Sequence, residues 1–154
     1  MTTQQNNGIN AITLLKDDHK KVKQAFAQFE ELGPQAYVGK KALADEICSE
    51  LRIHTQLEEE VIYPAFRKQL RDCKSLVNEA QVEHDSAKVL IEEIQNMDSE
   101  EELFDAKVKV LSEHIDHHVK EEEKEMFPLM QKSDIDLFSL GKKLVERKMQ
   151  LRDS

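Results

Sequence analysis

The chain has 154 residues, carries a formal net charge of −9 and contains only four glycines and three prolines. The negative charge argues against nucleic acid or an anionic membrane surface as the main partner. No apolar run approaches the roughly 20 residues that a membrane-spanning helix needs. Charged residues make up 34% of the chain, and so few helix-breaking residues favour long helices in one all-α domain.

The N-terminus lacks both the basic start and the apolar stretch of a signal peptide. We therefore expect residues 1–8 to form a short disordered tail. Cys48 and Cys73 form no Cys-x-x-Cys pair. Two isolated cysteines are typical of reduced thiols, so we expect the protein to be cytoplasmic.

Apolar residues spaced three and four apart predict a first helix from about residue 10 to residue 32. Its stripe comprises Ile12, Leu15, His19, Val22, Phe26 and Phe29. Asn10 is suited to cap the start of this helix, and Gly33 with Pro34 predicts its end. A histidine therefore occupies a core position of the first helix.

The same periodicity predicts a second helix from about residue 38. Pro64 lacks a backbone N–H and disfavours helical geometry in the residue before it, so we expect a kink or break near Tyr63. Residues 65–70 are expected to resume the helix. A third helix follows, and its stripe comprises Val77, Ala80, His84, Ala87, Ile91 and Ile94.

Ser99 and Glu102 have the spacing of a capping box, which predicts the start of a fourth helix. Residues 133–136 offer another helix start, and the leucines that follow predict a fifth, amphipathic helix. Four long helices with short connections predict an antiparallel up-and-down four-helix bundle over residues 9–132. The C-terminal helix, within residues 133–154, is expected to pack on this bundle.

Two eleven-residue stretches, at residues 54–64 and 118–128, share the pattern His-x-x-x-Glu followed by an aromatic residue and proline. Matching residues of the two stretches lie 64 positions apart, and His19 and His84, which precede them, lie 65 apart. Because the repeat is in register and rich in metal-ligating residue types, it predicts a two-metal site inside the bundle.

A His and a Glu at positions i and i+4 of a helix project from the same face. Buried carboxylates cost several kcal/mol each unless they are paired or coordinated, and no Lys or Arg lies beside these glutamates on the inner stripes. Imidazole suits iron, zinc, copper and nickel, and a carboxylate between two histidine clusters can bridge two ions. The predicted ligands are His19, His54, Glu58, His84, His118 and Glu122.

His114 lies one turn before His118 on nearly the same face, and we predict it as a seventh metal ligand. His117 falls off the stripe and is expected at the surface. Tyr63 and Phe127 are expected to pack against the kinks. We expect a solvated run of charged side chains at Glu59, Glu60, Glu121 and Glu123. In one alternative, a neighbour of Glu58 acts as a spare metal ligand.

This order of motifs resembles the hemerythrin-like family, known as the HHE cation-binding domain. The family pattern is a His, a His-x-x-x-Glu, a second His and a second His-x-x-x-Glu, with one element on each helix. The resemblance covers roughly residues 9–132. It implies a non-haem centre of two iron ions, oxo- or hydroxo-bridged, with Glu58 and Glu122 bridging and histidines capping each iron. Members that carry O2 have a His-x-x-x-His pair on the third helix, whereas this chain has Lys88 four residues after His84. This departure puts simple O2 transport in doubt.

The resemblance implies binding of O2 or of a related small oxidant, such as peroxide or nitric oxide, and leaves several functions open. One is reversible binding or redox turnover of the oxidant. Another is an iron- or O2-responsive sensing or iron-handling module, and a third is a redox enzyme of oxidative or nitrosative stress defence. The protein is expected to be a monomer, or a dimer if the C-terminal helix exposes an apolar face on residues 135–151.

Overall fold

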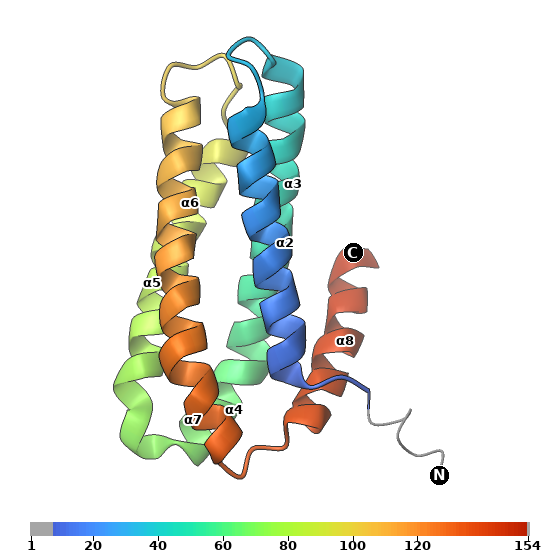
Figure 1. Ribbon diagram of the computed structural model, residues 1–154, viewed down its shortest axis with the longest axis vertical. Coiled ribbons are helices and arrows are strands. Elements are labelled where there is room, and N and C mark those ends of the chain that lie inside the picture. Colours follow the sequence, from blue (N-terminus) through green and yellow to red (C-terminus); the bar gives the residue numbers. More distant parts are fainter. Residues whose placement is uncertain (1–7, 154) are drawn as a thin grey trace.

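The computed structural model describes residues 8–153, and these form an antiparallel helical bundle with one further helix beside it (Figure 1). The α-helices are α2 (Ala11–Glu31), α3 (Tyr37–Leu57), α4 (Tyr63–Gln69), α5 (Lys74–Gln95), α6 (Phe104–Glu121), α7 (Phe127–Lys132) and α8 (Leu137–Asp153). Shorter turns link them: two π-helical turns, Glu58–Ile62 and Glu122–Met126, and the 3-10 turn Arg71–Cys73. The described residues contain no strand, and the predicted all-α, antiparallel bundle with an additional C-terminal helix is confirmed.

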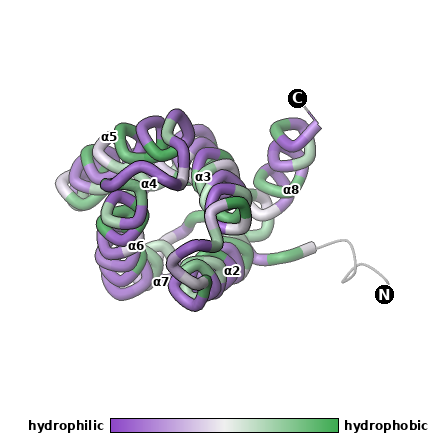
Figure 2. Tube along the Cα trace, turned by 90° about the horizontal axis from the view of Figure 1, so that it is seen from above, coloured by the Kyte–Doolittle hydropathy of each residue, from purple (hydrophilic) through white to green (hydrophobic). Residues whose placement is uncertain are grey.

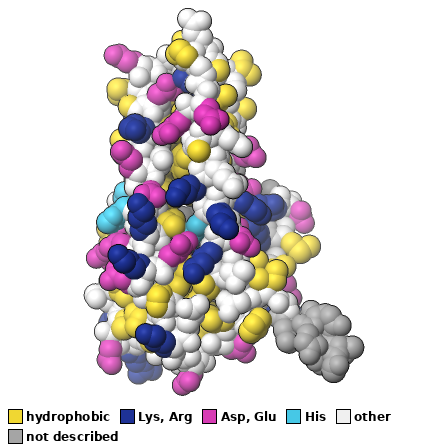
Figure 3. Space-filling view, viewed as in Figure 1, with side chains coloured by type: hydrophobic (Ala, Val, Ile, Leu, Met, Phe, Trp, Pro, Cys, Tyr) yellow, Lys and Arg dark blue, Asp and Glu magenta, His cyan; other side chains and the backbone are white. Residues whose placement is uncertain are grey.

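The chain runs up α2, down α3, up α5 and down α6, and then turns back into α8 (Figure 1). Seen along the bundle, the four long helices surround a common core, and α8 lies outside them, against α2 and α3 (Figure 2). Charged side chains of both signs cover the face shown in Figure 3, as is typical of a solvated surface. The predicted disordered tail falls mainly on residues outside the described range.

The first helix begins as its sequence predicts. The Asn10 side chain accepts a hydrogen bond from the backbone N–H of Ile12 at 2.8 Å, so it satisfies one of the free donors of the first turn. At the start of α6 the prediction is wrong. The Ser99 hydroxyl donates to the carbonyl oxygen of Tyr37 at 2.6 Å, and α6 begins only at Phe104 without a side-chain cap. Ser99 thus joins two loops at one end of the bundle.

Pro64 and Pro128, the prolines of the two repeated motifs, do not break their helices. Each lies just after a π-helical turn, in which the N–H of Tyr63 bonds to the carbonyl oxygen of Glu58, and the N–H of Phe127 to that of Glu122. A proline has no N–H to donate and its ring crowds the carbonyl four residues earlier. One extra residue in the turn changes which carbonyl faces the ring, so the backbone stays helical through Pro64.

The apolar core is divided into two clusters by a layer of buried polar side chains. One cluster, which includes Leu15, Leu57 and Phe66, joins the ends of the helices to α4, α7 and α8. The other includes Phe26 and Ile91 and fills the opposite half of the bundle. The polar layer between them comprises His19, His54, Glu58, His84, His118 and Glu122, all of them buried.

Ion pairs hold helix α8 against the bundle, and Gly141 of α8 packs closely on the backbone of Ile9. Arg147 bonds Glu60 at 2.7 Å, and Lys148 bonds Asp18 at 2.9 Å. Apolar side chains of α8 are also exposed, including Met149 at 62%, but a dimer through this helix stays a prediction. None of the described helices is long and apolar enough to span a membrane.

Both cysteines are free. Burial, together with the charge of Asp45, raises the pKa of Cys48 to about 12, so this thiol stays protonated and a poor nucleophile at neutral pH. Cys73 is partly buried. The prediction of two unpaired thiols is confirmed, and neither lies among the residues of the polar layer.

Replacing Gly141 by Ala is expected to destabilise the protein by about 1–3 kcal/mol, the usual cost of forcing an extra carbon into a packed site. A Cβ at this position would overlap the carbonyl oxygen of Ile9 and lie 3.2 Å from the backbone N of Ala11. Since both neighbours are backbone atoms, α8 or the segment before α2 must move. Urea unfolding followed by circular dichroism measures the change.

Gly39 provides the matched control, because a Cβ there meets only a side-chain methyl of Leu32 at 3.8 Å. Gly39 lies inside α3, where alanine is favoured over glycine by about 0.5–1 kcal/mol. The Gly39→Ala protein should therefore be slightly stabilised. Equal stability changes in the two variants would contradict the close contact at Gly141.

Candidate metal centre

Each of the four long helices contributes one histidine to the polar layer. His19 lies on α2, His54 on α3, His84 on α5 and His118 on α6. The two motif glutamates are the first residues of the π-helical turns and have almost no solvent exposure: 0% for Glu58 and 3% for Glu122. The i, i+4 spacing therefore places imidazole and carboxylate together, as the sequence predicts.

The potential ligand atoms form two adjoining groups that share Glu58. One group consists of His19, His54, Glu58 and Glu122, and the other of Glu58, His84 and His118, with the ligand atoms of each group within 4.8 Å of one another. Glu58 Oε1 lies 3.0 Å from His84 Nε2 and 3.5 Å from His54 Nε2. A carboxylate that faces histidines from both groups is suited to bridge two ions.

The second motif glutamate also faces both groups. Its Oε1 lies 3.2 Å from His19 Nε2, and its Oε2 lies 3.5 Å from His118 Nε2. The two oxygens of Glu122 thus point to histidines on opposite sides of the layer. The pair of glutamates forms the centre of the site, with two imidazoles on either side.

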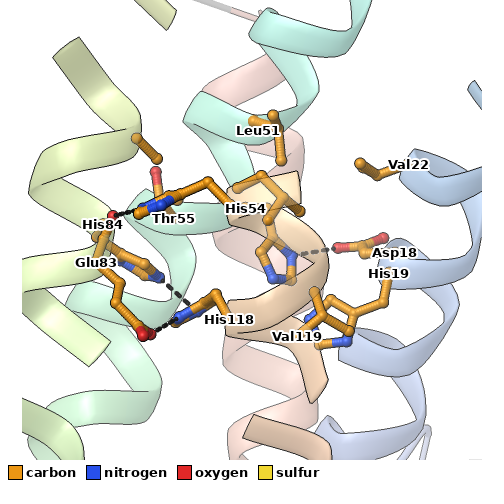
Figure 4. A pocket seen from close by; sticks show the side chains of 13 residues that line it. Asp18, His19, Val22, Leu51, His54, Thr55, Glu83, His84, His118 and Val119 are labelled. Carbon is orange, nitrogen blue, oxygen red and sulfur yellow. Dashed lines mark hydrogen bonds and ion pairs between the residues drawn. The ribbon is translucent and has the colours of Figure 1, made fainter. Parts of the chain in front are cut away.

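The outer nitrogen of every one of these histidines faces a further carboxylate. The Nδ1 pairs are His19 with Glu123 (2.6 Å), His54 with Asp18 (3.2 Å), His84 with Glu59 (2.8 Å) and His118 with Glu83 (2.6 Å). Figure 4 shows the second and the fourth of these contacts. A carboxylate can only accept here, so Nδ1 carries the hydrogen and Nε2 is turned inward, as in histidines that bind metal ions.

Several buried polar atoms at the centre have no hydrogen-bond partner in the described structure. They are His19 Nε2, His54 Nε2, Glu58 Oε2 and Glu122 Oε1. Leaving a buried donor or acceptor unsatisfied costs about 1–3 kcal/mol. The residues that carry these four atoms form one of the two groups, so a cation bound among them would offer these atoms a partner. The donor set thus fits a metal ion.

The electrostatics of the metal-free site show what the carboxylates require. Burial opposes a charge on His54, but Glu58 and Asp18 outweigh it and raise the pKa of His54 to about 10. Burial likewise opposes a charge on His118, yet Glu122 and Glu58 raise its pKa to about 12. Burial alone would raise the pKa of Glu58, but the facing histidines hold it well below its usual range. Protons on the imidazoles therefore stand in for metal ions.

A partly enclosed cavity of about 20 Å³ adjoins the histidines on the side of the Phe26 cluster. Its walls include the four histidines and apolar side chains such as Val22, Leu51 and Ile115 (Figure 4). A cavity of this size has room for about one water-sized molecule. The cavity therefore places a small space beside the four histidines of the polar layer.

Comparison with known families agrees with this geometry. The family model described as the hemerythrin HHE cation binding domain matches residues 10–130, most of the chain. The chain belongs to the hemerythrin HHE family. A crystal structure of a hemerythrin HHE cation binding domain-containing protein from Mycobacterium kansasii superposes with a TM-score of 0.79 at 26% identity, covering 94% of this chain and 88% of that one. A search of curated proteins gives no significant match.

His114 lies apart from both groups of this HHE domain. Its Nε2 is 3.0 Å from the backbone carbonyl oxygen of Glu83, so Nε2 carries the hydrogen of that bond. The ring lines the cavity without joining the ligand atoms, and its assignment as a ligand stays a prediction. His117 is exposed, as expected, with 66% of its side chain accessible.

Tyr63 packs in the apolar core beside the π-helical turn, and it also reaches the site of this HHE domain, which the sequence did not predict. Its hydroxyl lies 3.0 Å from both His84 Nε2 and Glu122 Oε2, and 3.4 Å from Glu58 Oε1. Burial, together with the two nearby carboxylates, raises the pKa of Tyr63, so the phenol keeps its proton. Phe127, at the matching position of the repeat, has its ring stacked parallel to the His19 ring, with 6.0 Å between the ring centroids.

The carboxylates that bond the outer nitrogens of the histidines were not predicted: Glu59 and Glu123, expected in a solvated charge run, are half-buried and bond His84 and His19. A signal for them exists in the repeat. An acid precedes each single histidine, and another acid follows each motif glutamate. The repeat-related carboxylates are Asp18 with Glu83 and Glu59 with Glu123.

The stability of the metal-free protein is expected to fall as the pH rises from about 6.5 to 10. The pKa of His54 is raised from 6.5 to about 10, and that of His118 to about 12. A group whose pKa is higher in the folded state stabilises that state fully below its unfolded pKa, and loses this contribution as the pH climbs to the folded pKa. Each such histidine gives a slope of about 1.4 kcal/mol per pH unit.

Urea unfolding in the presence of a chelator, at pH 6, 8 and 9.5, measures this dependence. The metal-loaded protein serves as the comparison, because bound ions replace the protons on the imidazoles and the loss should shrink. Below pH 4 stability should fall again as Asp18, whose pKa is lowered to about 2, becomes protonated. A free energy of unfolding that is constant from pH 6 to pH 9.5 would contradict protonated histidines in the metal-free site.

Proposed function

We propose that this HHE domain is a non-haem di-iron protein that binds O2 or a related small oxidant, such as peroxide or nitric oxide. The observation that carries the proposal is the pair of ligand groups joined by Glu58, together with the inward Nε2 atoms of His19 and His54, which have no hydrogen-bond partner in the described structure. Mixed imidazole and carboxylate ligands suit iron, whereas calcium and magnesium prefer shells made of oxygen atoms alone.

In this proposal two histidines would hold each ion, and Glu58 and Glu122, which face both pairs of histidines, would serve both ions. His19 and His54 would bind one iron, and His84 and His118 the other. The iron pair, when bound, supplies the electrons for reaction with a small oxidant. The chain binds and positions the ions: the outer carboxylates fix each imidazole with Nε2 inward.

The surroundings of the ligand groups support a small apolar guest. The two apolar clusters flank the polar layer and exclude bulk water from it. The adjoining cavity of about 20 Å³ has room for a molecule about the size of water and has largely apolar walls. Two free thiols are in keeping with a reducing compartment, and we propose a cytoplasmic location.

A second candidate function, a redox enzyme of oxidative or nitrosative stress defence, is favoured by Tyr63. Its hydroxyl is a proton-bearing group beside the second ligand pair, 3.0 Å from His84 Nε2. Reduction of a small oxidant consumes protons. Bound ions would neutralise the two carboxylates that help to raise the pKa of Tyr63, and the phenol would then be positioned to supply a proton from its Oη atom.

Metal analysis combined with an optical spectrum, recorded before and after the reduced protein meets O2, tests the proposal. Two irons per chain and a stable, reversible charge-transfer band would support binding. Two irons and rapid conversion to the ferric form would support the redox enzyme. Fewer than two metal ions per chain, after loading under anaerobic conditions, would overturn the di-iron centre.

Replacing His114 by Ala is expected to leave two metal ions bound, because its Nε2 is engaged with the carbonyl oxygen of Glu83. Replacing His118 by Ala should weaken metal retention by more than about tenfold, since even the loss of a group that supports a ligand has an effect of that size. Metal content after dialysis against a chelator compares the two variants. Loss of iron from His114→Ala alone would restore His114 to the ligand set.

Replacing Tyr63 by Phe is expected to preserve metal content but to slow oxidation of the reduced protein by O2 by about 10²-fold or more, the usual contribution of a positioned proton donor. Stopped-flow spectroscopy measures the rate. Tyr37, the other tyrosine of the chain, is 37% exposed at the start of α3, so Tyr37→Phe is the matched control. An unchanged rate in Tyr63→Phe would remove the proton-donor role.

A further inference from the structure

A third group of metal-ligating side chains lies outside the buried centre, on the outer side of α5 and α6. His117 and Glu121 are four residues apart on α6, and Glu83 reaches them from α5. His117 Nε2 lies 3.3 Å from Glu121 Oε1 and 3.6 Å from Glu83 Oε2. One ligand atom from each of the three lies within 4.8 Å of the others. This spacing suits donors around a single ion.

The charge of this group also favours a cation. It has two carboxylates and one imidazole, and the only ion-pair partners of Glu83 and Glu121 in the described structure are histidines. No Lys or Arg neutralises either carboxylate there. Glu121 is 33% exposed and His117 66% exposed, so an ion from solution has direct access to the group.

In the first half of the repeat, lysine side chains neutralise the carboxylates that surround the histidines. Asp18 matches Glu83, and its outer oxygen accepts a bond from the Lys148 ammonium at 2.9 Å. Glu59 is likewise held by Lys88 at 2.8 Å. On Glu83 the outer oxygen faces His117 instead. The fixed positive charge of one half is thus replaced in the other by a pair of side chains that can ligate an ion.

We propose that Glu83, His117 and Glu121 bind a divalent first-row metal ion, such as Mn²⁺ or Fe²⁺, at the surface. Imidazole and carboxylate donors suit these ions, and solvent water completes the shell. The other oxygen of Glu83 accepts a hydrogen bond from His118 Nδ1 at 2.6 Å. One carboxylate therefore contacts both the outer ion and a histidine of the buried centre, and the outer site captures ions for that centre. This last role rests on the proposed function.

Titration with Mn²⁺ of protein that holds two irons per chain, and from which any further iron has been removed, tests the outer site. Mn²⁺ binds most weakly in the first-row series, so it does not displace iron from the centre. The electron paramagnetic resonance signal of free Mn²⁺ counts the ions that bind. We expect one Mn²⁺ per wild-type chain, and binding weaker by at least about tenfold in His117→Ala and in Glu121→Gln, given the size of ligand-supporting effects.

Asp116→Asn is the matched control for Glu121→Gln. It removes a carboxylate from the same helix, but Asp116 pairs with Lys120 at 2.8 Å and is not part of the group. This control should bind Mn²⁺ as the wild type does. The outer site is overturned if the wild type binds no Mn²⁺, if both site variants bind it unchanged, or if Asp116→Asn loses it equally.

The capture role has its own measurement. Uptake of Fe²⁺ by the metal-free protein should be slower in His117→Ala than in the wild type, with the same final number of buried ions. An equal rate would overturn capture. Failure of the buried centre is distinguishable, because every variant would then lack the buried ions while the difference of one Mn²⁺ between wild type and His117→Ala would persist.

Discussion

Two carboxylates in the middle of an apolar bundle are the constraint on which the rest of this structure depends. Glu58 and Glu122 lie between two hydrophobic clusters and have almost no contact with solvent. An uncompensated buried charge costs several kcal/mol, so the fold persists only if positive charge comes with it. Imidazolium groups supply that charge in the metal-free chain, and metal ions would supply it without protons. Folding and ion binding are thereby linked through the same atoms.

The outer carboxylates turn this local requirement into a property of the whole bundle. Asp18 on α2 bonds His54 on α3, and Glu59, after α3, bonds a histidine on α5. Glu83 on α5 bonds a histidine on α6, and Glu123, after α6, bonds back to α2. Every neighbouring pair of long helices is thus joined by one imidazole–carboxylate bond. This closed ring fixes the vertical register of the helices, which apolar side chains alone specify only loosely.

The buried histidines and glutamates of the candidate centre could be predicted from the sequence because they lie on the apolar stripes of their helices. The outer carboxylates could not, since each is adjacent to a ligand and therefore projects about 100° away from it round the helix. An acid in that direction faces either solvent or a neighbouring helix, and only the packing decides which. Ser99 illustrates the same limit: its capping-box pattern is present in the sequence, but a loop from another part of the chain offers its hydroxyl a better partner.

The position of Tyr63 in the site could not be predicted from the sequence, because it depends on the π-helical turn. In an α-helix a residue five positions after Glu58 lies about 140° round the axis, which points it away from the carboxylate. The π-helical turn adds a residue to that turn and brings Tyr63 back to the side of Glu58, where its hydroxyl meets both glutamates. The other half has the same turn but carries Phe127. A nearly symmetric scaffold therefore offers a proton beside one ligand pair and an apolar ring beside the other, so the two halves of the centre differ in the chemistry they can support.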